Sequence, residues 1–136
     1  MAIRRVQITT SVASGGAGSA SAAGVSASPI NGIILAIHLA GSDSPPNTTD
    51  VTIAEKHNSP AMPILTVTNF AADGWYQPLA QAEDTAGATF TGAGVGVPVC
   101  DHINLSIAQA NNGDGMTATI YYVELFPGAG QPGART

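Results

Sequence analysis

The sequence predicts an all-β fold, an antiparallel sandwich or barrel. Along several segments the hydrophobic residues recur at every second position, which places them on one face of a strand. Clusters of Gly, Pro, Asn, Asp and Ser separate these segments at roughly regular spacing. No segment has the 3.6-residue period of a strong amphipathic helix. Short strands divided by turns in this way are typical of sandwiches and barrels.

Five segments carry the alternation most clearly. They are "NGIILAIHLA" (31–40), "DVTIAEKH" (50–57), "PILTVTNF" (63–70), "HINLSIAQA" (102–110) and "MTATIYYVELF" (116–126). In the first, one face is expected to consist of Ile33, Leu35, Ile37 and Leu39. In the fourth, we expect Ile103, Leu105 and Ile107 in the core. The fifth is apolar on both faces, which predicts a central strand.

The stretch from 102 to 125 is expected to form a β-hairpin, because "NNGDG" (111–115) lies between two alternating runs. Asn, Asp and Gly tolerate the positive φ angles that such turns require. The cluster lacks the spaced carboxylates and the closing Glu of a calcium loop. In "QPLAQAEDTAG" (77–87) a short helix is an alternative, since Pro78 suits a helix start and Gly87 a helix end.

The segment "SVASGGAGSASAAGVSAS" (11–28) is low in complexity, and two interpretations stay open. It is either a flexible arm, because Gly and Ser have little to bury, or a strand of small residues where another backbone or subunit comes close. The tail "PGAGQPGART" (127–136) is expected to be loose. We therefore expect one β-sandwich domain over 1–136, with its core at about 20–126 and flexible N- and C-terminal arms.

The amino-acid composition limits the kinds of partner that this chain can be expected to bind. Only 10% of the 136 residues are charged, against roughly 25% in average soluble proteins. Low charge keeps self-repulsion weak, so packing against other subunits costs little electrostatically. The net charge is −5, and the only cationic side chains besides histidine are Lys56, Arg4, Arg5 and Arg135. This composition argues against nucleic acid as a partner, since phosphate binding needs clustered Lys and Arg.

The sequence also predicts a cytoplasmic origin. Cys100 is the only cysteine, which excludes an intrachain disulfide and the small disulfide-rich secreted class. The start "MAIRRVQITTSV" lacks the apolar core of a signal peptide. No run of about 18 apolar residues is present to span a membrane. We expect a soluble chain made in a cytoplasm, with no membrane partner.

Two groups of residues are weak candidates for catalysis or phosphate binding. "GAGVGVP" (92–98) has the glycines of a phosphate loop but not the following helix, so we expect a turn between short strands. Cys100, Asp101 and His102 are consecutive, and alternation on a strand would turn Asp101 away from His102. A buried structural thiol is the preferred interpretation of Cys100. We expect no catalytic residue and no enzyme.

The three histidines are candidate zinc ligands only if the fold gathers them. His38, His57 and His102 come from separate segments, with no paired spacing such as HxH. His38 is expected instead on a partly wet strand face. We therefore expect no metal and no cofactor.

The strongest aromatic cluster is Trp75, Tyr76 and Pro78 in "DGWYQPL" (73–79). One interpretation is core filling. A second is an anchor for a partner protein, since Trp and Tyr dominate interface hot spots. A third is a sugar-binding platform, although few other aromatics are present to extend it. The three residues are the candidate interface residues of the chain.

Four phrases, in this order, are similar to phrases of small all-β structural proteins from tailed bacteriophages. They are "SPINGIILAIHL" (28–39), "PPNTTDVTIAE" (45–55), "ILTVTNFAADGWYQPLAQAEDTAG" (64–87) and "INLSIAQANNGDGMTATIYYVE" (103–124). Over most of residues 20–125 the chain resembles a phage head decoration (cement) protein, or a neck or tail component built on a similar sandwich.

This resemblance implies a jelly-roll-like sandwich on the outer surface of the virion. Such a protein would sit as a dimer or trimer over joints between major capsid protein subunits and stabilise the head. Its work would be adhesive, through buried interface area and added strands. The alternatives are a neck, tail or fibre-base component and a carbohydrate- or receptor-binding module. The scarcity of basic residues favours the outside of the shell over a portal channel.

Overall fold

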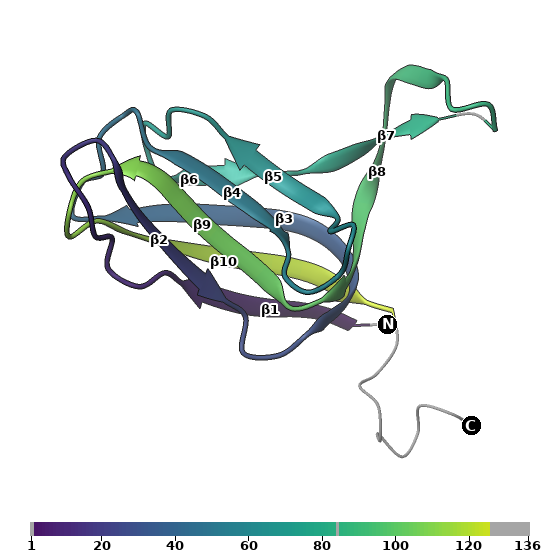
Figure 1. Cartoon of the computed structure of the whole chain (residues 1–136). Coiled ribbons are helices and arrows are strands. Elements are labelled where there is room, and N and C mark those ends of the chain that lie inside the picture. The colour runs from purple at the N-terminus through teal and green to yellow at the C-terminus, as the bar shows by residue number, and fades with distance from the viewer. Residues whose placement is uncertain (1, 84, 126–136) are drawn as a thin grey trace.

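The computed structural model describes residues 2–83 and 85–125, which form two antiparallel sheets packed face to face (Figure 1). The predicted all-β sandwich is confirmed, whereas its likeness to a jelly roll stays a prediction. The strands are β1 (Ala2–Thr9), β2 (Ala20–Val25), β3 (Ile30–Ser42), β4 (Asp50–Glu55), β5 (Pro63–Val67), β6 (Gly74–Tyr76), β7 (Leu79–Glu83), β8 (Thr89–Asp101), β9 (Ile103–Ala110) and β10 (Gly115–Glu124). Within this described part no helix is present that could cross a membrane.

One sheet has the order β1-β10-β3-β8-β7, with β6 paired to β3, and the other has the order β2-β9-β4-β5. β10 lies between β1 and β3, as its apolar faces predict. The predicted hairpin at 102–125 is wrong, because β9 and β10 belong to different sheets. The turn at "NNGDG" carries the chain across the sandwich. Its Gly113 has a φ of 97°, and the carboxylate of Asp114 accepts the N–H of Asn111 at 2.7 Å.

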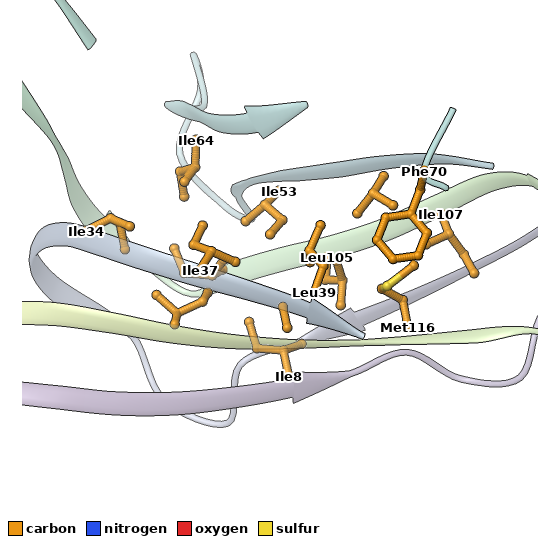
Figure 2. Close-up of a cluster of buried hydrophobic side chains, with 14 of the residues drawn as sticks. Ile8, Ile34, Ile37, Leu39, Ile53, Ile64, Phe70, Leu105, Ile107 and Met116 are labelled. Carbon is orange, nitrogen blue, oxygen red and sulfur yellow. The ribbon is translucent and has the colours of Figure 1, made fainter. Parts of the chain in front are cut away.

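The core lies between the two sheets (Figure 2). In β9 the alternation holds, since Ile103, Leu105 and Ile107 are all buried. Leu105 and Ile107 face Leu39 and Met116 of the opposite sheet in Figure 2. Burial of such aliphatic side chains is the main driving force for folding, at about 25 cal/mol per Å² of apolar surface.

The predicted core face of β3 is right for Ile37 and Leu39 but wrong for Ile33 and Leu35, because a β-bulge interrupts the alternation. Tyr121 of β10 pairs with Ala36, but the next residue, Tyr122, pairs with Ile34, so Leu35 is extra on β3. Ile34 and Ile37 therefore both point into the core, and Leu35 is exposed. A single extra residue reverses the facing of everything that follows it.

The N-terminal arm predicted for the first 20 residues is also wrong. Residues 2–9 form β1, which pairs with β10 along its whole length, and Ile8 is buried in the core. Of the two interpretations of residues 11–28, the strand is confirmed, since β2 pairs with β9. A Cβ atom on Gly24 of β2 would lie 2.4 Å from the carbonyl oxygen of Thr9. The small residues therefore allow one backbone to approach another, as expected.

β7 and the first part of β8, up to Gly96, form a hairpin that projects beyond the sandwich (Figure 1). β8 pairs with β3 from Val97 to Asp101, and before that it pairs only with β7. The alternative of a short helix at 77–87 is wrong, because β7 is a strand. The turn predicted at 92–98 is likewise replaced by the extended backbone of β8. The tail at 127–136 lies outside the described residues.

Candidate functional site

The outer face of the larger sheet carries a row of side chains across four strands. Gln7 of β1, Thr119 of β10, His38 of β3 and Trp75 of β6 are neighbours in register. Successive side chains along a strand point to opposite faces of the sheet, whereas residues in register point to the same face, so these four side chains lie together on the outer face. Gln7 donates a hydrogen bond to the Thr119 hydroxyl at 3.2 Å. The row is polar at one end and aromatic at the other.

Trp75 forms the aromatic end of this row. Its ring lies 5.0 Å from that of His38 and 5.7 Å from that of Tyr121, measured between centroids. Trp75 remains 58% exposed. Together with Arg5 and Thr119, these three residues surround a shallow depression of about 210 Å³. We call this surface the aromatic face; its π systems and one cation suit a flat polar ligand or a partner side chain.

The three predicted interface residues do not lie on one surface. Trp75 points outward from β6, but the next residue, Tyr76, is half-buried against the core. Pro78 is buried and so cannot act as a surface anchor. Core filling is thus the correct interpretation for Tyr76 and Pro78. The aromatic neighbour of Trp75 is Tyr121, which the sequence places 46 positions away and which only the β3–β10 register brings near.

The projecting hairpin of β7 and β8, which we call the arm, exposes apolar side chains. Leu79 is 64% exposed and Val95 is 52% exposed. Gly96 lies where β8 leaves the sandwich, and a Cβ there would come within 2.3 Å of the Ile33 side chain. β7 is the last strand in its sheet, so its outer backbone groups face away from the other described strands. Such an edge is a template for pairing with another chain.

The loop between β4 and β5, residues 56–62, folds over the corner where β8 turns into β9. Asp101, 7% exposed, holds this loop in place. Its Oδ2 accepts the N–H groups of His57 and Asn58, and its Oδ1 accepts the N–H of His102 at 2.7 Å. Burial raises the pKa of Asp101, but these three hydrogen bonds together outweigh it and hold the pKa below its usual value.

Glu55, 9% exposed, holds the same loop from the other side. Its Oε1 accepts the N–H of Met62 and its Oε2 the N–H of Cys100, both at 2.9 Å. Burial raises the pKa of Glu55, as does the nearby Asp101 carboxylate more weakly, but hydrogen bonds from Cys100, Met62 and Asn58 lower it by more. The two carboxylates therefore stay ionised at neutral pH and fix the loop to the corner.

The corner brings two of the three histidines together. The rings of His57 and His102 lie 5.4 Å apart between centroids, and His102 Nδ1 lies 4.0 Å from Asp101 Oδ1. His38 belongs instead to the aromatic face. The prediction that Asp101 would face away from His102 is wrong, because residue 102 lies outside both strands and the alternation stops there. Local spacing in the sequence does not signal this grouping, which follows from the pairing of β4 with β9 that ends at Glu55 and Ile103.

Cys100 is exposed, so the predicted buried thiol is wrong. It precedes Asp101 on β8 and faces the other side of the strand. There it lines an open groove of about 410 Å³ together with Met62, Val99 and Leu125. The groove is mainly apolar, and its only carboxylate, Glu55, is already bonded to backbone. This arrangement offers a mainly apolar contact surface on which the Cys100 thiol is exposed.

No family model matches this chain, and neither does any curated protein. Among solved structures, one described as "Crystal Structure of FLHE" has a TM-score of 0.46 and 11% sequence identity to it. The similar region covers 90% of this chain and 98% of that one. A TM-score of this size does not establish a shared fold.

Proposed function

We propose that this chain is a structural protein of a bacteriophage virion, a head decoration (cement) protein that binds over joints between major capsid protein subunits. The observation that carries the proposal is the arm. A two-stranded hairpin alone is marginal in water. Extending it beyond the sandwich with Leu79 and Val95 exposed is favourable when a neighbouring subunit covers it.

The partner that fits the arm is a neighbouring capsid subunit. No other described strand pairs with the outer edge of β7, so a strand of the neighbour can be added there. The low charge of the chain removes most electrostatic cost of placing it on a repeated array. The proposal that this array is a phage capsid is based on the four phrases of the sequence that are similar to those of phage structural proteins. A neck, tail or fibre-base position uses the same adhesive surfaces and differs in copy number.

Binding to phage heads that lack the protein tests this proposal. We expect Leu79→Asp to leave the thermal unfolding transition unchanged, because Leu79 is exposed, but to weaken head binding at least tenfold. The matched control is Val12→Asp. Val12 is 70% exposed and lies outside the arm, so this variant should bind as the unaltered protein does. If Leu79→Asp and Val12→Asp bind heads equally well, the arm is not part of the attachment surface.

A second candidate function is carbohydrate or receptor binding at the aromatic face. The depression between Trp75, Tyr121, His38 and Arg5 favours it, since sugars stack on aromatic rings and accept hydrogen bonds from Arg. It predicts a measurable affinity for an oligosaccharide on a glycan array, which Trp75→Ala abolishes and Leu79→Asp leaves intact. Head binding unaffected by Trp75→Ala would separate this function from capsid attachment.

A further inference from the structure

The chain carries a cluster of metal-binding side chains that the proposed function does not use. His57 comes from the β4–β5 loop, and Asp101 and His102 come from the β8–β9 corner. One ligand atom of each residue lies within 4.8 Å of the other two. We propose that His57, Asp101 and His102 form a binding site for a divalent transition-metal ion of the zinc class. The site is independent of attachment through the arm.

The geometry of the two imidazoles suits a shared ion. At a Zn–N distance of about 2.0–2.1 Å and a tetrahedral angle, two ligating rings have centroids about 5 Å apart. The rings of His57 and His102 are 5.4 Å apart with an angle of 82° between their planes. Ligand atoms around such an ion are about 3.4 Å apart, so atoms that lie up to 4.8 Å apart must approach by up to about 1.4 Å. Rotation of the exposed His57 side chain can supply that movement.

Asp101 has one acceptor position left for an ion. A carboxylate offers about four lone-pair sites, and backbone N–H groups occupy two on Oδ2 and one on Oδ1. The remaining site is on Oδ1, which lies 4.0 Å from Nδ1 of His102. The hydrogen bonds also fix the orientation of this carboxylate before any ion arrives. That preorganisation is what second-shell partners supply in known metal sites.

The chemistry of the ligand set selects the class of ion. Two imidazoles and one carboxylate suit zinc, cobalt or nickel, whereas magnesium and calcium prefer sites made of oxygen. Asp101 and nearby Glu55 give this corner negative charge, which favours a cation. Three protein ligands leave at least one position for water. Bound there, the ion would join the β4–β5 loop to the β8–β9 corner.

Titration of the full chain with zinc and cobalt tests the site. We expect Zn²⁺ to raise the midpoint of thermal unfolding in a concentration-dependent way, and Mg²⁺ to have no such effect. Co²⁺ should give visible d–d absorption typical of tetrahedral or five-coordinate nitrogen and oxygen ligands. Calorimetry should show one site per chain. Each of His57→Ala and His102→Ala should weaken zinc binding at least about tenfold. Loss of a second-shell partner already lowers metal affinity by about 10–100-fold, and loss of a direct ligand should lower it by at least as much.

His38→Ala is the matched control, because His38 lies on the aromatic face and not in the cluster. It should bind zinc as the unaltered chain does, and so should Cys100→Ser. His57 is exposed, so His57→Ala should fold normally, which circular dichroism verifies. The proposal is overturned if zinc does not bind, if His57→Ala binds equally well, or if Cys100→Ser abolishes binding.

Discussion

Replacing Gly24 with Ala tests how closely the two sheets approach at the β1–β2 edge. A Cβ on Gly24 would lie 2.4 Å from the carbonyl oxygen of Thr9, 2.9 Å from its carbonyl carbon and 3.1 Å from the Cα of Thr10. All three atoms belong to backbone, so no side-chain rotation relieves the contact. Overpacking of this kind costs about 1–3 kcal/mol. The lower entropy of the unfolded alanine chain offsets about 0.4–1 kcal/mol of that cost.

The middle values of these two ranges leave a net loss of about 1.3 kcal/mol, which corresponds to a fall in Tm of roughly 5 °C for a domain of this size. Calorimetry, together with urea unfolding, measures both quantities. The matched control is Gly74→Ala in β6, where an added Cβ meets no atom within 4 Å. That variant should be as stable as the original or slightly more so. If Gly24→Ala proves as stable as Gly74→Ala, the close approach of β2 to β1 is not correct.

Three other predictions concern stability. Leu105→Ala removes a fully buried side chain and should cost about 2–5 kcal/mol in urea unfolding; a cost below 1 kcal/mol would place Leu105 outside the core. Glu55 has a folded pKa below its usual 4.5, so its contribution is present above that pH and is lost as pH falls through the folded pKa. Glu55→Gln should therefore flatten the loss of stability below pH 4.5, and an unchanged acid limb would contradict this. Asp114→Ala removes the acceptor of the part-buried N–H of Asn111 and should cost about 1–3 kcal/mol, whereas Asn112→Ala in the same turn should cost little.

The period of two was sufficient to predict the fold class and most of the core. In β4, and in β9 up to Ile107, buried residues alternate with more exposed ones, so Leu105 and Ile53 could be placed from the sequence. Leu35 could not, because a bulge depends on the partner strand β10 and leaves no mark in the periodicity of β3. The hairpin at 102–125 failed for a related reason. A turn between two strands does not specify whether they pair or cross to opposite sheets.

The surface features depended on pairing that the sequence does not display. Trp75 was predicted to be a candidate interface residue, with core filling as an alternative, but its neighbour Tyr121 comes from a strand that meets it only through β3. His57 and His102 lie 45 positions apart and approach because β4 pairs with β9 up to Glu55. Non-local register of this kind is fixed by the whole sandwich. Local spacing therefore predicted neither the aromatic face nor the histidine cluster.

The most direct test of the proposed role is a cryo-EM reconstruction of the virion, combined with mass-spectrometric counting of this chain in purified particles. The account predicts copies on the order of hundreds per particle, arranged with the symmetry of the shell. It also predicts density for the sandwich above joints between capsid subunits, with the arm (β7 and β8 up to Gly96) in contact with a neighbour. About a dozen copies at one vertex would assign the chain to the neck or tail. Absence from purified virions would contradict the account.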